Sequence, residues 1–146
     1  MTTSASARRS GLTLVELVLV MTIIGLTTLV MMRQLQLLLD RMATRDAVRA
    51  AAGAVNRARD EALAQHTRVS VRIDTATADL DVRAHGASLG HTGLAQTHAV
   101  KVSTTRDSIT FDTRGLGYGA ANLTLVARRG AAADTLTVSR LGRVKY

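Results

Sequence analysis

One carboxylate, Glu16, lies near the start of an almost unbroken apolar run, GLTLVELVLVMTIIG, at residues 11–25. It is the only ionisable side chain from Leu12 to Met32. A carboxylate at the centre of a bilayer costs about 2.5 to 3.5 kcal/mol, so such residues are usually functional. If the chain is cut after Gly11, the new ammonium group of Leu12 lies about one helical turn from Glu16, and neighbouring subunits can pair the two charges. A glutamate solvated by lipid head groups is the alternative interpretation.

The remaining polar residues form no recognisable catalytic or metal-binding pattern. The four histidines lack the H-x-H and H-E-x-x-H spacings of metal ligands, and the absence of cysteine excludes disulfides and thiolate-bound metals. Residues 115–120 fit G-x-G-x-x-A by letter. The dinucleotide fingerprint must open a helix, however, whereas residues 121–127 have the pattern of a strand, so we expect a turn there. We predict neither an enzyme nor a cofactor.

Basic residues are concentrated near the C-terminus of a chain whose formal net charge is +8. They are Arg128, Arg129, Arg140, Arg143 and Lys145, followed by Tyr146. If the last strands are adjacent, these cations converge on a strip that neutralises several phosphates, and Tyr146 can stack on a base. The candidate DNA contacts are therefore Arg140, Arg143, Lys145 and Tyr146. A solubilising surface is the alternative.

The element that carries Glu16 is predicted to be a long helix. Residues 12–32 number 21, which at about 1.5 Å per residue matches a hydrocarbon core about 30 Å thick. Residues 33–66 contain no proline, and their apolar positions recur mostly at helical spacing, with an alanine-rich stripe. We therefore expect a transmembrane helix that continues as an amphipathic helix, its alanine stripe facing a sheet.

After His66 the apolar pattern changes to a period of two, which is typical of strands. Alternating stretches occupy residues 67–73, 78–84, 97–103, 107–112, 121–127 and 134–140. The first two, joined by residues 74–77, predict a β-hairpin. Residues 86–93, rich in glycine, predict a mobile loop. The sequence thus predicts an α+β fold: a long N-terminal helix packed on a mostly antiparallel β-sheet whose other face is in water.

The N-terminal sequence RRSGLTLVEL, at residues 8–17, resembles the class III signal of type IV prepilins and type II secretion pseudopilins. This resemblance implies that residues 1–11 are a leader, cut between Gly11 and Leu12 by a prepilin peptidase, and that Leu12 is then N-methylated. It also implies that Glu16 sets the register between fibre subunits. The chain departs from the usual pattern in having Leu12 where Phe is usual and Arg33 where many relatives have Pro.

The C-terminal part is similar to the minor pseudopilin H family, GspH/FimT. The similarity lies in FDTRGLG at residues 111–117, a strand near residues 123–126 and LGRVK at residues 141–145. It implies a pilin-like fold in which residues 12–32 span the membrane, 33–66 form the soluble part of the helix and 67–146 form a β-rich pseudopilin domain. The FimT branch ends in a G-R-x-R pattern associated with DNA binding. Lys145 replaces its second Arg, which keeps the charge and loses bidentate geometry.

The orientation in the membrane is predicted differently by charge and by resemblance. Four arginines after the span, at positions 33, 41, 45 and 49, outnumber Arg8 and Arg9 before it. The positive-inside rule alone would therefore place the C-terminal part in the cytoplasm. The resemblance instead implies a single-pass protein of the bacterial inner membrane with a cytoplasmic N-terminus and a periplasmic globular domain.

Two functions of different classes follow from the resemblance. The first is a minor pseudopilin of a type II secretion pseudopilus or type IV pilus, acting in fibre assembly and protein secretion. The second is a DNA-binding minor pilin for DNA uptake in natural transformation. The implied partners are a prepilin peptidase, other pilins or pseudopilins, an inner-membrane assembly platform, membrane lipid and, for the second function, DNA. A membrane-anchored domain with no fibre role is the third alternative.

Overall fold

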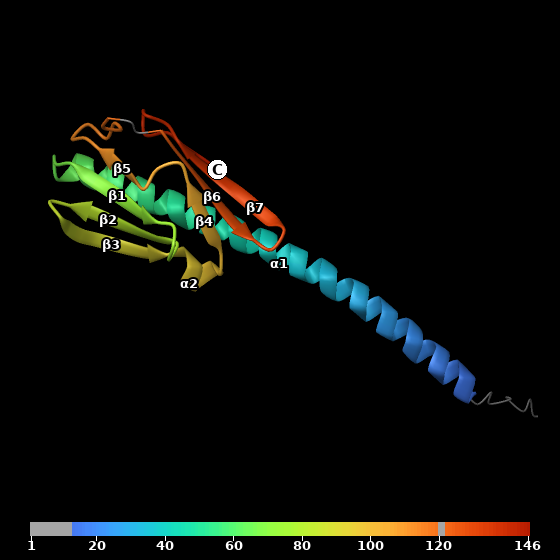
Figure 1. Cartoon of the computed structure of the whole chain (residues 1–146). Helices are drawn as coiled ribbons and strands as arrows, with labels where there is room; N and C mark the ends of the chain where they lie inside the picture. The colour runs from blue at the N-terminus through green and yellow to red at the C-terminus, as the bar shows by residue number, and fades with distance from the viewer. Residues whose placement is uncertain (1–12, 120–121) are drawn as a thin grey trace, which may run out of the picture. The chain divides into compact units, whose positions relative to one another are not determined.

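The computed structural model describes residues 13–119 and 122–146, so the expected leader and the cleavage site at Gly11 and Leu12 lie outside the described residues. The described elements are, in chain order, α1 (Leu14–Ala64), β1 (Val69–Asp74), β2 (Asp79–Ala84), β3 (Ala87–Gly93), α2 (Leu94–His98), β4 (Lys101–Thr104), β5 (Ser108–Phe111), β6 (Leu123–Arg129), β7 (Ala132–Val138) and β8 (Val144–Lys145) (Figure 1). The chain divides into two compact units, of which the first ends at Gln36 and the second begins at Leu37.

The first unit is the N-terminal part of α1, which is helical without interruption. All of its described side chains are exposed, and this part of the helix is long and apolar enough to cross a membrane. Three threonine hydroxyls within it donate to backbone carbonyls one turn earlier: Thr22 to Val18, Thr27 to Ile23 and Thr28 to Ile24. The hydroxyls of these three threonines therefore already have partners within the helix.

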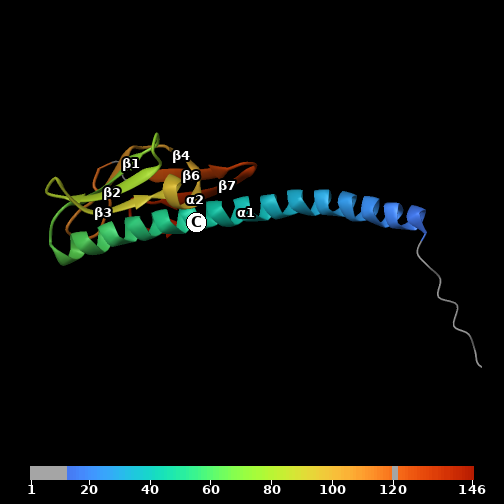
Figure 2. The same ribbon diagram turned by 90° about the horizontal axis from the view of Figure 1, so that it is seen from below.

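In the second unit, α1 contributes an alanine stripe to the core. The fully buried members of this stripe are Ala47, Ala51, Ala54, Ala58 and Ala62. Their spacing puts them on one helix face, and small side chains let a sheet pack closely there. Figure 2 shows the strands on one side of this part of α1. The expectation of an alanine-lined face buried in the domain is confirmed.

The strands form two four-stranded sheets, with orders β3-β2-β1-β5 and β4-β6-β7-β8, and all neighbouring strands are antiparallel. The predicted α+β fold is confirmed, although the strands form two sheets where the sequence suggested one. The difference arises between β4 and β5, which are consecutive in the chain but pair in different sheets, with β6 and β1 respectively. A period of two identifies a strand and does not identify its partner.

The predicted hairpin of β1 and β2 is confirmed, with Asp74 paired to Asp79 at its closed end. Asp74 Oδ1 accepts the N–H of Ala76 at 2.8 Å, which stabilises the turn. Two local predictions are wrong. Residues 86–93, expected as a loop, contain β3, and residues 97–103, expected as a strand, begin in α2. β3 is an edge strand with most side chains exposed, so it shows no apolar alternation, and α2 is held by one buried side chain, Leu94.

The core is built almost entirely from aliphatic side chains. Phe111 is the largest fully buried side chain, and the inner faces of both sheets supply most of the rest. They include Leu80, Ile109, Leu123, Leu125, Leu136, Val69, Val71 and Val138. Burial alternates along β1, β2 and β6, as expected for sheets with one face on the helix and one in water.

Candidate functional site

Thr13 caps the N-terminus of α1 and places Glu16 in the first turn. Thr13 Oγ1 accepts the Glu16 N–H at 3.2 Å, and the Thr13 carbonyl accepts the Leu17 N–H at 3.1 Å. This is half of a capping box, in which a Thr and a Glu three residues later stabilise a helix start. The negative charge of Glu16 also lies at the positive end of the helix dipole. The T-x-x-E spacing is visible in the sequence and could have predicted this cap.

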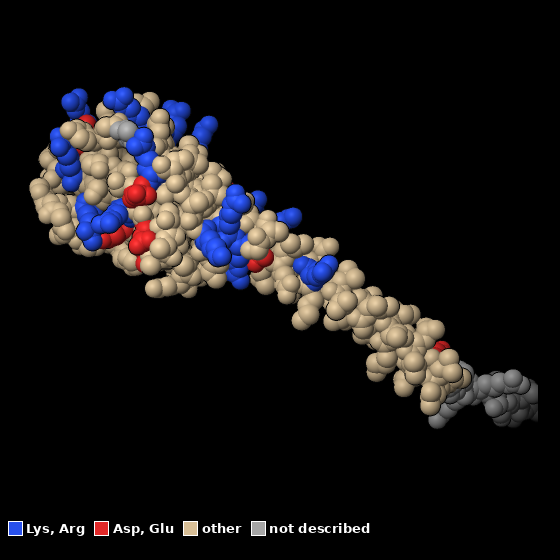
Figure 3. All heavy atoms as spheres, viewed as in Figure 1, with Lys and Arg blue, Asp and Glu red and all other residues tan. Residues whose placement is uncertain are grey.

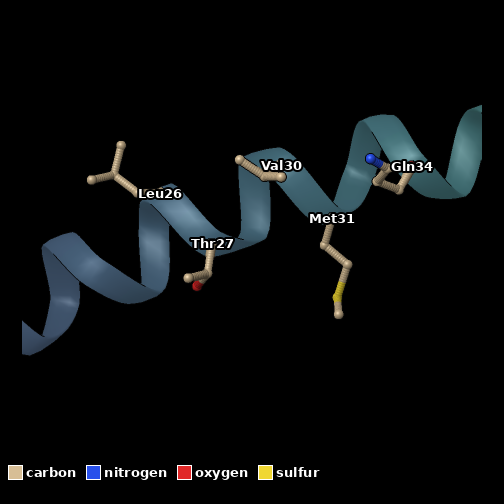
Figure 4. Close-up of a pocket in the computed structure, with 5 residues that line it drawn as sticks. All are labelled: Leu26, Thr27, Val30, Met31 and Gln34. Carbon is tan, nitrogen blue, oxygen red and sulfur yellow. The ribbon is translucent and has the colours of Figure 1, made fainter.

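The Glu16 carboxylate makes no hydrogen bond or ion pair with residues 13–119 or 122–146. The helix around it is exposed from Leu14 to Leu39 and is apolar up to Met32, after which Arg33, Gln34 and Gln36 alternate with leucines. A hollow on this surface is lined by Leu26, Thr27, Val30, Met31 and Gln34, whose side chains are drawn in Figure 4. All five project from a single helix, so the hollow is a gap between side chains. This surface suits lipid tails or other helices rather than a small ligand.

The four candidate DNA contacts lie at one end of the second sheet. Arg140 and Arg143 flank the turn between β7 and β8: the Arg140 N–H donates to Asn122 Oδ1 at 2.9 Å, and the Arg143 N–H to Ser139 Oγ at 3.2 Å. Lys145 lies in β8 and pairs with Thr137 of β7. Tyr146 is exposed. The structure therefore brings these candidates together.

Arg128 and Arg129 do not join that group, because they lie at the other end of β6. The strand rise puts Arg128 about 13 Å along the sheet from Thr124, the residue aligned with Lys145 across β7. Arg129 has a structural role instead. Its Nε is 3.0 Å from Asp40 Oδ1 on α1, and its Nη1 donates to the His98 carbonyl at 3.0 Å.

Asp112 organises the FDTRGLG loop that follows β5. Its Oδ1 accepts the N–H groups of Arg114 and Leu116, both at 2.9 Å, while its own N–H and carbonyl bond to Leu116 and Gly115. The Leu116 N–H bond is the largest of the effects that hold the pKa of Asp112 below its usual value, and the cations Arg114 and Arg68 add to it. The carboxylate is therefore charged and fixes the loop.

Arg59 of α1 ties this loop to the turn after β7. Arg59 Nε donates to the Gly115 carbonyl at 3.1 Å. Gly142, at φ +72°, lies against the same carbonyl: a Cβ on Gly142 would be 3.0 Å from the Gly115 oxygen and 3.2 Å from Arg59 Nε. The Gly117 N–H also donates to the Arg140 carbonyl at 2.9 Å. No sequence signal pointed to Arg59, whose partner is 56 residues away.

The loop and the turn together line a cavity of about 340 Å³, whose walls include Asp112, Arg114, Leu116, Tyr118, Arg140 and Leu141. The guanidinium group of Arg68 stacks over the Tyr118 ring, 4.0 Å from its centroid. Figure 3 shows Lys and Arg side chains along the edge of the domain where Figure 1 draws this loop and turn. Among the described residues, no three metal-ligating side chains come together.

Comparison with known proteins identifies the family. The sequence profile described as type II transport protein GspH matches residues 47–142, well over half of the chain. The chain belongs to the GspH family. No curated protein sequence matches it. The matched region of this GspH-family chain includes the alanine stripe of α1, the FDTRGLG loop and Gly142.

Two solved structures share the fold. Both are crystal structures of the type IV minor pilin FimU of Pseudomonas aeruginosa strain PAO1, in different space groups. One is 19% identical with a TM-score of 0.61, covering 72% of this chain and 88% of FimU. The other is 18% identical with a TM-score of 0.57, covering 69% of this chain and 90% of FimU. The predicted pilin-like fold is confirmed.

Family membership and fold establish the general role. As a GspH-family protein, the chain is a structural fibre subunit and not an enzyme, and it acts in the assembly of a pilus or pseudopilus. The N-terminal apolar helix fits a pilin anchored in the inner membrane, and other pilins or pseudopilins are the partners that this family indicates.

Proposed function

We propose that the chain is a minor pseudopilin of a type II secretion pseudopilus or a type IV pilus, acting in fibre assembly and protein secretion. The observation that carries this proposal is the exposed, mostly apolar surface of α1 from Leu14 to Leu39, with the charged Glu16 in its capped first turn. In the membrane this surface contacts lipid. The assembly platform then extracts the subunit from the membrane. In the fibre, the same surface packs against other subunits.

The register of that packing is set by charge. A prepilin peptidase cuts between Gly11 and Leu12, and the N-methylated ammonium group of Leu12 pairs with Glu16 of a neighbouring subunit. An unpaired carboxylate inside an apolar bundle is far more costly than a paired one, so registers that leave Glu16 alone are excluded. The N-terminus is cytoplasmic and residues 67–146 form the periplasmic domain, with 12–32 as the span and 33–66 as the soluble part of the helix.

Mass spectrometry of the protein purified from membranes tests the processing step. We expect a mature chain that begins at Leu12 and carries one added methyl group. A Gly11→Val variant should keep the leader, because a branched side chain then stands directly before the proposed cut. A purified protein that begins at its initiator methionine would overturn the proposal. Protease protection in spheroplasts tests the orientation, and digestion of residues 67–146 from the periplasmic side is expected.

Substitutions at Glu16 separate its charge from its capping role. Glu16→Gln removes the charge and keeps a side chain that suits the third position of a capping box. We expect Glu16→Gln and Glu16→Ala to be excluded from sheared fibres equally, while Asp46→Asn, which alters another exposed carboxylate of α1, is incorporated normally. Normal incorporation of Glu16→Gln would show that the charge does not set the register.

The second candidate function, DNA uptake, is favoured by the grouping of Arg140, Arg143, Lys145 and Tyr146 at one end of the second sheet. Two or three cations there can neutralise phosphates, so binding should weaken steeply with salt. We expect full-length protein in detergent to shift labelled DNA at low salt and an Arg143→Ala, Lys145→Ala variant not to do so. Arg106→Gln, at an exposed arginine outside this group, is the matched control. Absence of any shift at low salt would exclude this function.

A further inference from the structure

The exposed large apolar side chains of the globular domain are concentrated at one place. In the described part of residues 67–146 they are Leu89, Leu116, Tyr118, Leu141 and Tyr146. Three of the five, Leu116, Tyr118 and Leu141, line the cavity formed by the loop after β5 and the turn after β7. They are 37%, 53% and 67% exposed. Apolar side chains gathered in this way on a polar surface mark an interaction site.

The same cavity carries positive charge. Arg114 and Arg140 line it, and Arg68 lies over Tyr118. Neither Arg114 nor Arg140 makes an ion pair with residues 13–119 or 122–146. The one carboxylate in the wall, Asp112, already accepts two backbone N–H groups. The surface therefore offers two guanidinium groups, each able to bind a carboxylate through paired hydrogen bonds.

This composition distinguishes a protein partner from a nucleic acid. Tyr and Arg with neighbouring aliphatic side chains are typical of the energetic centre of protein interfaces. A polyphosphate would gain nothing from the apolar side chains of Leu116 and Leu141, whereas a peptide can bury an apolar side chain against them. The cavity, at about 340 Å³, is near the lower limit for ligand pockets, so it holds one or two side chains.

We propose that this cavity, with Arg114 and Arg140 at its walls, docks an acidic segment of another polypeptide. In that segment an apolar side chain enters between Leu116, Tyr118 and Leu141, and adjacent carboxylates bind the two arginines. The inference rests on the proposed function only in placing the segment on a neighbouring fibre subunit. Binding itself requires neither leader cleavage nor Glu16, so the two proposals can fail separately.

Fluorescence anisotropy with full-length protein in detergent micelles tests the site. The probe is a fluorescein-labelled peptide of alternating Glu and Leu, and its controls replace Glu by Gln or Leu by Ser. We expect binding of the Glu and Leu peptide alone, weakened at least tenfold by Arg114→Gln with Arg140→Gln and also weakened by Leu141→Ser. The control variant Arg106→Gln should bind normally, because Arg106 is outside the cavity.

A reversal of charge keeps the test valid if a variant is poorly folded. Arg114→Glu with Arg140→Glu should lose the Glu and Leu peptide and gain a Lys and Leu peptide, a gain that a misfolded protein would not give. Equal peptide binding by the wild type and the Arg114→Gln, Arg140→Gln variant would overturn the proposal. So would failure of the peptide to bind while a labelled single-stranded oligonucleotide binds in an Arg114-dependent manner, since the cavity would then be a nucleic-acid site.

Discussion

Gly142 links the basic C-terminal turn to the rest of the domain. Its φ of +72° is a conformation that side chains with a Cβ rarely adopt, and a Cβ there would press on the Gly115 carbonyl at 3.0 Å. The Gly115 carbonyl is in turn held by Arg59. The glycine of the G-R-x-R-like pattern is thus explained by packing, and Arg143 is presented by a turn that depends on it.

Gly142→Ala should destabilise the domain by about 2 kcal/mol, since the backbone cost of the left-handed region adds to the contact with Gly115. Gly86→Ala is the matched control. Gly86 has φ +83°, and a Cβ added to it would have no atom within 4 Å, so it should show the backbone cost alone, about 1 kcal/mol. Urea denaturation followed by circular dichroism measures both. Equal losses would show that the contact with Gly115 contributes nothing.

Asp112 should make the stability of the globular domain depend on pH in the acidic range. The Leu116 N–H bond and the nearby arginines lower the pKa of Asp112 from its usual 3.8, so the folded state binds a proton less readily than the unfolded chain. This contribution is complete above the usual pKa and is lost as the pH falls through the lower folded-state pKa. We expect the urea concentration at the midpoint of unfolding to decrease as the pH is lowered below about 4. This decrease should be smaller in the Asp112→Asn variant. An unchanged acid profile in that variant would contradict the role.

Candidate functional residues could be predicted from the sequence where the pattern that marks them lies within a few neighbouring positions. Glu16 stands out as a candidate because one charge in an apolar run is visible in the sequence, and the grouping of Arg140, Arg143 and Lys145 follows from their closeness in the chain. The partners that build the site were not visible. Arg59 meets Gly115 across 56 residues and Arg129 meets the His98 carbonyl across 31, and no periodicity encodes such pairs.

At the scale of elements, Arg129 joins α1, β6 and the end of α2. Its bond to Asp40 is half-buried, and the strand pairing of β6 with β4 and β7 holds it in place. Elements were predictable where burial alternates, as in β1, β2 and β6. They were not predictable at β3, whose exposed edge position removes the alternation on which the prediction depends.

A double-mutant cycle of Asp40→Asn and Arg129→Gln should give a coupling energy of about 1 kcal/mol, reduced from a buried pair's value because the Arg129 side chain is 38% exposed. The pair Asp46 and Arg49, with side chains 51% and 64% exposed, is the control and should couple by less than about 0.5 kcal/mol. Thermal unfolding in detergent gives the free energies of unfolding of the four proteins in each cycle. A larger coupling in the control would contradict this assignment.

At the scale of the whole molecule, all the buried apolar side chains of the described residues lie between Ala47 and Val138. The part of α1 before Leu37 contributes nothing to that core and makes a compact unit of its own. Folding of the globular domain and insertion of the apolar helix therefore rest on different residues, which is why their sequence signals could be interpreted separately.

A fragment from Leu37 to Tyr146 should consequently fold by itself. We expect a soluble protein with mixed helix and strand circular dichroism and a single cooperative unfolding transition, because the fragment keeps the whole described core. Its melting temperature should lie within a few degrees of that of the full chain in detergent. Aggregation or a transition without cooperativity would show that the N-terminal helix is needed for folding.

The internal bonds of Thr22, Thr27 and Thr28 have a consequence for how a subunit changes surroundings. Since each hydroxyl is already satisfied by its own helix, leaving the bilayer for a fibre breaks none of these bonds and forms none in their place. The exchange then substitutes hydrocarbon tails with side chains of similar polarity. On the proposed function, a subunit therefore passes between bilayer and fibre without exchanging any of these three side-chain hydrogen bonds.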